Sequence, residues 1–403
     1  MLIHRRGKFA IFMTFLIVSA FLSVEIRYIK LPVSWNGELK RFSFQSLIHL
    51  SPINQRVARP HTEDALVKDG FLNGAGQIPV FYQDIEPEVG AYHIYFMETS
   101  SRRTITQRGL CVIESWCSAN RNATVWYLVT SATLVEASWV DLMEVVAVHR
   151  NLRLAYLDFN LALNDTPLAG LYASDKFAET LEEFLPYNLS DLCRLAVVYK
   201  SGGFYSDMDT LALRSVLNLT NFIALYNDKT KRFANAAFHF ERRHLMLLKI
   251  MQHIADHYDG IIWAYNGPVA IMQTVERLGC DVIPSNATGE SISIQSQPAV
   301  LGNSTKHKKK PARKLEVCDW LVLKQSIFYP IHWSHSHGKL FLASRKGSNN
   351  QTIEEIFPGS YGVHFGDKFM KEIYPQKGSL ILKIVRQVCP IIITKHPFLK
   401  NIA

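Results

Sequence analysis

The chain has 403 residues, of which 48% are hydrophobic and 20% are charged, a composition typical of a globular protein and not of a largely disordered one. Its length suits one large α/β domain or two ordinary ones. Much of the net charge of +9 comes from a lysine-rich run at 306–314. Because no aromatic residues are interleaved with it, this run predicts a solvated loop and argues against nucleic-acid binding.

The N-terminal sequence predicts a membrane anchor. Residues 1–8 (MLIHRRGK) are basic, whereas residues 9–24 carry no charge. An apolar segment extended to residue 26 is long enough for a short span, and the basic flank favours a cytosolic tail. A cleaved signal peptide is the alternative, but no small-residue cleavage site follows the apolar segment. We therefore expect a type II membrane protein with a cytosolic tail at 1–8, a transmembrane signal-anchor at 9–26 and a stem at 27–90.

Sequons and cysteines also indicate a translocated domain. Seven Asn-x-Ser/Thr sequons favour a glycosylated luminal domain, and they lie at Asn122, Asn164, Asn188, Asn218, Asn286, Asn303 and Asn350. Six cysteines allow up to three disulfides, with fifteen pairings open; they are Cys111, Cys117, Cys193, Cys280, Cys318 and Cys389. Since no C-x-x-C pair occurs, a zinc site is not expected.

The first predicted elements alternate between strands and a helix. We expect strands at 93–97, 124–132 and 152–159, which are short apolar runs, and a helix at 108–120, where apolar residues show helical spacing. This order predicts an α/β fold with a parallel sheet and right-handed crossovers. Ligands bind at the carboxyl ends of strands in such sheets, so Glu98, Thr99 and Ser100 are candidates for contacts with a nucleotide.

Further elements follow in the second half of the chain. Residues 188–203 predict a helix with Ser190 as its N-cap and Gly202 or Gly203 at its end. A strand at 204–213 would be interrupted by two acidic residues. We expect another strand at 233–240, helices at 244–258 and 266–279, and a low-complexity insertion at about 285–316.

The acidic pair in the strand at 204–213 is the first candidate for a functional site. Alternate residues of a strand point to the same side, so Asp207 and Asp209 would present both carboxylates together, with Met208 facing the core. Two adjacent carboxylates repel each other unless a cation lies between them, and oxygen ligands suit Mg²⁺ or Mn²⁺. An exposed acidic turn is the alternative. The position after a strand and a glycine pair favours the metal site.

Five blocks of sequence indicate a family. They lie at 189–210, 234–244, 256–271, 328–333 and 361–368. With these blocks the chain resembles the α-1,4-glycosyltransferases related to lactosylceramide 4-alpha-galactosyltransferase, from about residue 92 to beyond residue 370. The resemblance implies a GT-A-like nucleotide-sugar-binding fold with a mostly parallel central sheet, in a luminal catalytic domain at 91–403.

The resemblance also implies roles for individual residues. A D-x-x-R pair precedes the acidic pair in retaining GT-A enzymes, and Asp191 and Arg194 match it. A C-terminal histidine that completes metal coordination is matched by His364. The implied metal site is therefore Asp207, Asp209 and His364, and the implied donor-binding residues are Asp191, Arg194 and Asp207. Glu98, from its strand-end position, and Asn235 are further donor-binding candidates, with simple strand-end hydrogen bonding as the alternative for Asn235. Asp207, Asp209 and Asn266 form the implied catalytic set.

Other candidates have competing interpretations. Asn266 lies where related enzymes place an amide on the donor sugar, although an amide is a poor nucleophile. Trp263 and the aromatic residues at 328–333 are candidates for stacking on an acceptor sugar, with core packing as the alternative. A second histidine cluster has no spacing known for a metal site and predicts a polar loop; it consists of His332, His335 and His337.

The function implied by the resemblance is glycosyl transfer in the Golgi membrane. The enzyme would be retaining and dependent on Mn²⁺ or Mg²⁺, and would move galactose from UDP-galactose to lactosylceramide or a related glycosphingolipid. N-acetylgalactosamine or N-acetylglucosamine donors and glycoprotein acceptors are alternatives, as is an inactive luminal relative that binds UDP-sugar or glycan. A glycosidase is disfavoured because its two carboxylates would lie farther apart. The oligomeric state, a homodimer included, stays open.

Overall fold

The computed structural model describes residues 71–73, 77–286, 317–343, 351–370 and 372–397. The predicted cytosolic tail, the predicted anchor at 9–26 and most of the predicted insertion lie outside these ranges. Among the helices of the described ranges, none is long and apolar enough to cross a membrane.

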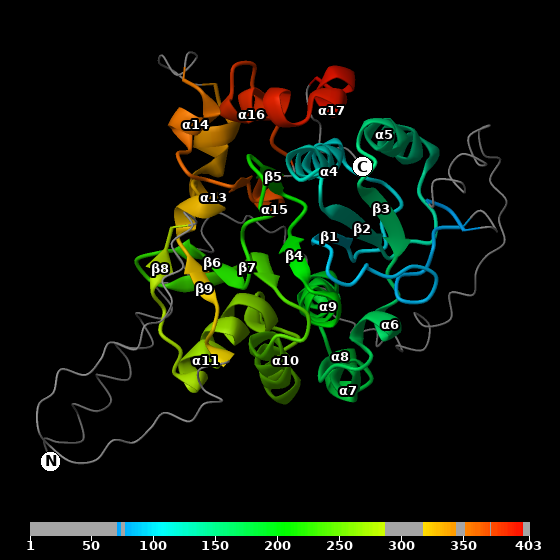
Figure 1. The fold of residues 1–403 in the computed structure, drawn as a ribbon, viewed down its shortest axis with the longest axis vertical. Helices are drawn as coiled ribbons and strands as arrows, with labels where there is room; N and C mark the ends of the chain where they lie inside the picture. Colours follow the sequence, from blue (N-terminus) through cyan, green and yellow to red (C-terminus); the bar gives the residue numbers. More distant parts are fainter. Residues whose placement is uncertain (1–70, 74–76, 287–316, 344–350, 371, 398–403) are drawn as a thin grey trace, which may run out of the picture. The chain divides into compact units, whose positions relative to one another are not determined.

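Eight of the described strands form one large mixed sheet, in the order β3-β2-β1-β4-β7-β6-β9-β8 (Figure 1). Its strands are β1 (His93–Glu98), β2 (Thr124–Val129), β3 (Leu152–Tyr156), β4 (Gly203–Ser206), β6 (Phe222–Asn227), β7 (Arg232–Phe240), β8 (Pro284–Ser285) and β9 (Leu321–Leu323). Strand β7 runs antiparallel to β4 and β6, and the other neighbouring strands are parallel. The predicted α/β fold with a mostly parallel central sheet is confirmed.

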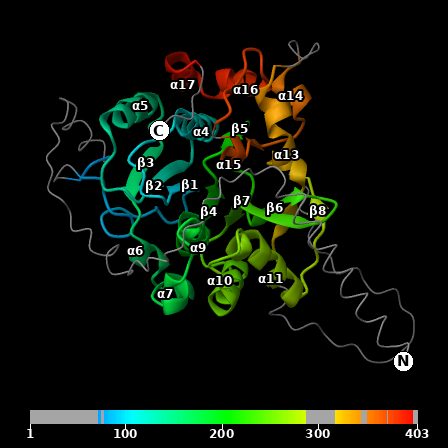
Figure 2. The same ribbon diagram turned by 180° about the vertical axis from the view of Figure 1, so that it is seen from behind.

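Helices cover the sheet in two groups, as Figures 1 and 2 show. One group includes α4 (Gln107–Ala119), α5 (Glu136–Val148), α14 (Ile353–Ile356), α16 (Leu380–Val388) and α17 (Pro390–Lys395). The other includes α6 (Phe159–Leu163), α7 (Leu168–Tyr172), α8 (Asp175–Ala178), α9 (Leu185–Ser201), α10 (Leu245–His257), the π-helical turn η1 (Tyr265–Val269) and α11 (Ala270–Leu278). Shorter helical turns are η2 (Gln325–Ile327), α13 (Trp333–Ser336), η3 (His337–Phe341) and α15 (Asp367–Met370).

Helix α9 leads through a glycine pair directly into β4, the strand that precedes the acidic pair. It begins upstream of Ser190, so the predicted N-cap is wrong: Ser190 lies inside the helix, and its hydroxyl accepts a hydrogen bond from Arg194. The predicted end is correct, because Gly202 caps the helix with φ 73°. Gly203 follows with φ 121°, and a Cβ there would lie 2.6 Å from the carbonyl oxygen of His93. Both glycines are therefore needed for the passage from α9 into β4.

A two-stranded antiparallel ribbon lies beside the large sheet. It pairs β5 (Thr210–Ala212) with β10 (Gly362–His364), and His364 is opposite Thr210 in the register. The predicted continuous strand at 204–213 is thus divided: β4 ends at Ser206, a turn holds the acidic pair, and β5 begins at Thr210. This pairing brings the chain on either side of residue 209 close to residue 364.

The packed domain begins earlier than predicted. Phe71, Leu72, Ile78 and Phe81 are buried in the core, and the backbone N–H of Phe81 donates to the carbonyl oxygen of Tyr156. The last part of the predicted stem at 27–90 is therefore part of the domain, because its apolar residues pack against the sheet instead of facing solvent.

Two disulfides form among the six cysteines. Cys111–Cys389 joins α4 to the C-terminal segment, and Cys280–Cys318 joins the two ends of the predicted insertion. The remaining two cysteines, Cys117 and Cys193, are buried thiols. Of the sequons, Asn188 is buried in α9, so it is not accessible for glycosylation in the folded chain.

Candidate functional site

The acidic pair lies in the turn between β4 and β5, at the carboxyl end of β4. One carboxylate oxygen of Asp207, one of Asp209 and a ring nitrogen of His364 all lie within 4.8 Å of one another. The structure therefore brings together the three residues predicted to hold a metal. The convergence depends on the turn and on the β5–β10 ribbon, and not on the strand alternation expected from the sequence.

Asp209 is held from the C-terminal side. Its Oδ2 accepts a hydrogen bond of 2.8 Å from the backbone N–H of Asp367, and its Oδ1 lies 3.1 Å from His364 Nε2. Burial would raise the pKa of Asp209, but His364 and the Asp367 N–H outweigh it and lower the pKa. Burial would likewise lower the pKa of His364, but Asp209 and Asp207 raise it.

The Oδ1 atom of Asp209 shows that the three residues fit a divalent cation. It is buried and, within the described part of the chain, receives no hydrogen bond of good geometry, although His364 Nε2 is near. A buried carboxylate oxygen whose nearest donor is poorly aligned is left partly unsatisfied, which is costly. Two carboxylate oxygens and one imidazole nitrogen within 4.8 Å of one another are a donor set that Mn²⁺ and Mg²⁺ accept.

Arg194 fixes the other carboxylate of the pair. Its Nη1 donates to Asp207 Oδ1 over 2.8 Å, and the Tyr205 hydroxyl donates to the same oxygen over 2.7 Å. The guanidinium also lies 4.4 Å from the centroid of the Tyr205 ring. Arg194 is buried, and its guanidinium also donates hydrogen bonds to the carbonyl and hydroxyl oxygens of Ser190 and to the Asn235 carbonyl oxygen. Arg194 therefore positions Asp207. Because these N–H groups are used inside the protein, the geometry does not favour the direct contact with the donor sugar nucleotide that the resemblance implies for Arg194.

Asp191 and Asn235 form a second polar pair next to Arg194. The Asn235 amide donates to Asp191 Oδ1 over 2.6 Å, and Arg194 Nη2 lies 3.6 Å from the same oxygen. Burial raises the pKa of Asp191 to about 6, against the opposing effects of Arg194 and Asn235. A carboxylate with a pKa near neutrality beside the cluster of Asp207, Asp209 and His364 is a candidate for a functional group.

Asn266 is a structural bridge in this fold. Its Nδ2 donates to Asn188 Oδ1 and to the Asp259 carbonyl oxygen, each over 2.6 Å, and its Oδ1 accepts from the Asp259 N–H over 3.1 Å. The side chain is 1% exposed. Because both ends of the amide are occupied inside the protein, the geometry does not favour the catalytic contact expected for Asn266.

Glu98 lies at the end of β1, which neighbours β4. Its carboxylate accepts hydrogen bonds from the backbone N–H of Ser100 over 2.7 Å and from the Ser100 hydroxyl. Thr99 donates its hydroxyl proton to the carbonyl oxygen of Pro186 at the start of α9, over 2.8 Å. The three predicted nucleotide contacts thus order the loop after β1, at the same edge of the sheet as the acidic pair.

Tyr329 is a site residue whose place was not predicted. Its hydroxyl is buried close enough to Asp207 and Asp209 that both carboxylates add to the effect of burial in raising its pKa. It approaches the Ala236 backbone but makes no hydrogen bond of good geometry within the described residues. The sequence signal was the aromatic block at 328–333, which suggested stacking and not a hydroxyl beside the carboxylates.

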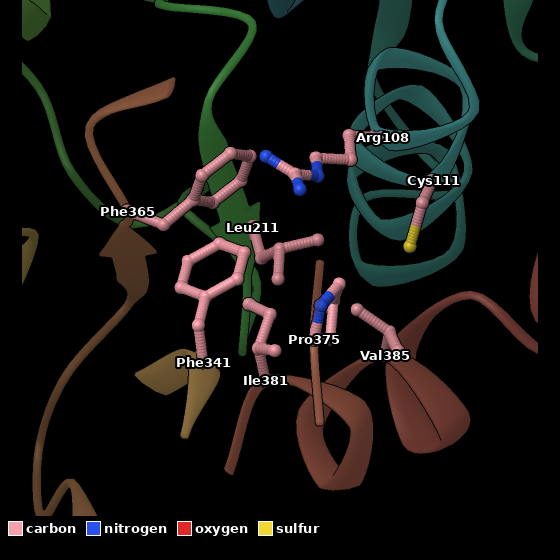
Figure 3. A pocket seen from close by; sticks show the side chains of 8 residues that line it. All are labelled: Arg108, Cys111, Leu211, Phe341, Phe365, Pro375, Ile381 and Val385. Atoms are coloured by element: carbon pink, nitrogen blue, oxygen red, sulfur yellow. The ribbon is translucent and has the colours of Figure 1, made fainter. Parts of the chain in front are cut away.

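Two other features lie apart from the site. The histidines at 332, 335 and 337 do not join a metal-binding group within the described ranges. A small cavity, seen in Figure 3, is lined by Arg108, Cys111, Leu211, Phe341, Phe365, Pro375, Ile381 and Val385. Its volume of about 10 Å³ gives room for roughly one water molecule, so the cavity between α4 and the C-terminal segment is a packing gap and not a substrate pocket.

Two known families match the chain in regions that meet at this site. The "Glycosyltransferase sugar-binding region containing DXD motif" matches residues 106–227, which include the acidic pair. The "Alpha 1,4-glycosyltransferase conserved region" matches residues 239–297 and 295–396, which include His364.

Individual relatives agree with these matches. The chain is 34% identical to lactosylceramide 4-alpha-galactosyltransferase of Pongo pygmaeus, over 62% of this chain and 98% of the relative. Its similarity to the human enzyme of that name is 27% identity over 76% of this chain and 77% of the relative. Human alpha-1,4-N-acetylglucosaminyltransferase is 28% identical over 46% of this chain and 54% of its own. The solved PaToxG glycosyltransferase covers 47% of this chain and 70% of its own, at 15% identity and a TM-score of 0.37, which is too low to support a functional comparison.

Proposed function

The chain belongs to the alpha-1,4-glycosyltransferase family, and from that premise we propose that it is a retaining, divalent-metal-dependent α-1,4-glycosyltransferase. The proposed reaction moves galactose from UDP-galactose to lactosylceramide or a related glycosphingolipid. The observation that carries the proposal is the convergence of Asp207, Asp209 and His364 at the carboxyl end of β4.

In the proposed mechanism these three residues hold Mn²⁺ or Mg²⁺. A cation bound there supplies a Lewis acid for the diphosphate of the UDP-sugar. Arg194 and Tyr205 hold Oδ1 of Asp207, which leaves its second oxygen for the site. Asp191, kept in place by Asn235, accepts hydrogen bonds from hydroxyls of the donor sugar. Retention follows because an α-linked donor would give an α-linked product.

The donor and acceptor are proposed from the relatives. The galactosyltransferases align over most of this chain, and the alpha-1,4-N-acetylglucosaminyltransferase aligns over less of it, so UDP-galactose is the first donor to test and UDP-N-acetylglucosamine the second. The predicted anchor at 9–26 supports a type II Golgi membrane protein with a luminal domain. Such an anchor would raise the effective concentration of a membrane-embedded acceptor.

The test uses the full chain in detergent with Mn²⁺, UDP-sugars and lactosylceramide, and analyses products by mass and by anomeric NMR coupling. We expect an α-1,4-linked product that disappears with EDTA. Asp209→Ala should abolish transfer, because it removes one of the three ligands, while the far-UV circular dichroism spectrum stays unchanged. Asp256→Ala, at an exposed position of α10, is the matched control and should retain activity. Transfer by Asp209→Ala at the wild-type rate would refute the metal assignment, and UDP-sugar binding without turnover would indicate the non-enzymatic alternative.

A further inference from the structure

An exposed apolar surface borders the site. We call it the rim patch, and its side chains, which are between 39% and 60% exposed, are Leu181, Tyr187, Ile261, Ile262, Trp263 and Phe369. Two segments meet there, because the backbone N–H of Leu181 donates to the carbonyl oxygen of Gly260 over 3.2 Å. Clustered apolar side chains left in solvent indicate a binding surface.

Lys368 connects the rim patch to the proposed metal site. Its Nζ lies 4.2 Å from the ring centroid of Trp263 and 4.7 Å from that of Tyr187. The preceding residue, Asp367, donates its backbone N–H to Asp209. The two aromatic rings therefore contact the side chain of Lys368, which follows directly on the residue whose backbone holds Asp209.

The loop that carries Trp263 is held in a costly conformation. Asp259 Oδ1 accepts from the N–H groups of Ile261 and Ile262 over 2.8 and 2.9 Å, and the amide of Asn266 ties the same loop to α9. Ala264 is left-handed, with φ 63°, which disfavours any residue with a Cβ. Trp263 is 49% exposed in this loop, and strained backbone of this kind is concentrated at ligand-binding sites.

The chemistry of the rim patch favours a neutral ligand. Glu179, Glu182 and Glu183 are exposed beside Leu181 and disfavour an anionic lipid surface, and they are balanced in part by the exposed Lys176 and Lys368. Aromatic faces stack on the apolar face of a pyranose ring, and an ammonium group donates hydrogen bonds to its hydroxyls. Aromatic rings and a single lysine at the edge of a donor site therefore fit an uncharged sugar.

We propose that Trp263 and Tyr187, with Lys368 between them, form the subsite for the neutral sugar of the acceptor. The inference rests on the proposed function, since a sugar bound there would reach the donor held at Asp207 and Asp209. The Trp263 ring face turned away from the Lys368 ammonium supplies the stacking surface, and Lys368 orients the sugar through its hydroxyls.

The experiment separates acceptor binding from donor binding. The full chain in detergent is assayed with Mn²⁺, UDP-galactose and either methyl β-lactoside or octyl β-lactoside. Trp263→Ala should raise the acceptor KM about tenfold or more for both glycosides, equivalent to about 1.4 kcal/mol, with the donor KM unchanged. Trp263→Phe should restore most of the affinity, and Lys368→Met should raise the acceptor KM without changing the donor KM. Val148→Ser, at an exposed position of α5, is the matched control.

A direct binding measurement keeps the two proposals distinguishable. Methyl β-lactoside is titrated into the wild type and Trp263→Phe in the presence of UDP and Mn²⁺, and the difference in tryptophan fluorescence is recorded. Failure of the wild type to bind UDP with Mn²⁺ would refute the proposed function. If UDP binds but methyl β-lactoside does not, or if Trp263→Ala affects only the octyl glycoside, the sugar subsite is wrong; the second result would assign the patch to the lipid chain.

Discussion

Gly267 packs directly against the polar pair of the site. A Cβ built there would lie 2.8 Å from Asp191 Oδ2 and would overlap Asn235 Nδ2. We expect Gly267→Ala to break the Asn235–Asp191 hydrogen bond, to lower the transfer rate at least tenfold and to lower the free energy of unfolding by about 1–3 kcal/mol. Kinetics and urea denaturation measure the two effects.

The control for this substitution is Gly170→Ala in α7, where a Cβ meets nothing within 4 Å. An alanine in a helix interior is favoured over glycine by about 0.5–1 kcal/mol, so this variant should be slightly more stable and fully active. If Gly267→Ala and Gly170→Ala had the same transfer rate and the same free energy of unfolding, close packing at Gly267 would have no role in the site.

Asp191 links stability to pH. Its pKa of about 6 in the folded chain exceeds the value near 3.9 of an unperturbed aspartate, so the folded state binds the proton more tightly. The free energy of unfolding should therefore fall as pH rises from about 4 to about 6. Asp191→Asn does not titrate, so its stability relative to the wild type should grow by on the order of 2–3 kcal/mol across that interval.

Chemical denaturation of the wild type and of Asp191→Asn from pH 4 to pH 8 measures this difference in stability.

The transfer rate of the wild type should fall below about pH 6, because protonation of Asp191 removes the charge that accepts hydrogen bonds from the sugar. A difference in stability that is constant with pH would show that Asp191 is not the group whose pKa is raised.

At the level of elements, a buried carboxylate caps the helix α17. Glu114 of α4 is fully buried, and its two oxygens accept from the N–H groups of Ile391 and Ile392, each over 2.9 Å. The first residue of α17 is Pro390, which has no N–H, so these are the donors that remain at the positive end of the helix. Glu114→Gln replaces one acceptor with a donor and should cost about 1–3 kcal/mol of unfolding free energy in urea titrations.

Glu144→Gln provides the comparison. Glu144 is exposed on α5 and pairs with Lys395 of the same helix α17 over 2.6 Å. An exposed ion pair contributes about 0–1 kcal/mol, so this variant should differ little from the wild type. A loss as large as that of Glu114→Gln would place the attachment of α17 in its surface charges and not in the buried cap.

The elements that the sequence predicted correctly are those with local signals. The apolar runs of β1, β2 and β3, the periodicity of α4 and the glycine end of α9 are all encoded within a few residues. The partners that complete the site are remote in sequence: His364 meets Asp209 through the β5–β10 pairing, and Arg194 meets Asp207 across a turn. The sequence predicts a catalytic contact for Asn266, because its partners Asn188 and Asp259 come together only in the folded chain.

On the scale of the whole molecule, the C-terminal segment is tied to α4 and completes the site. Arg108 donates to Asp367 over 3.0 Å and to the Met370 carbonyl over 2.8 Å, and the Cys111–Cys389 disulfide joins residues that are 278 apart in sequence. The backbone N–H of Asp367 in turn holds Asp209. The site therefore depends on the packing of the C-terminal segment against α4. The side chains of Asp209 and His364 are oriented by closer contacts, which are the Asp367 N–H and the β5–β10 pairing.

The two disulfides should differ in their effect on stability. Cys111–Cys389 closes a loop of 278 residues and Cys280–Cys318 a loop of 38, and a longer loop restricts the unfolded chain more. The Cys111→Ala/Cys389→Ala double variant should lose about 3–5 kcal/mol of unfolding free energy and the Cys280→Ala/Cys318→Ala double variant somewhat less. Thermal and urea unfolding of the two variants test the order. Transfer at 25 °C should persist in both, because the β5–β10 pairing and the Asp367 N–H orient Asp209 and His364 without either bridge. If the shorter loop gave the larger loss, strain or packing in the folded state would outweigh the entropy of the unfolded chain.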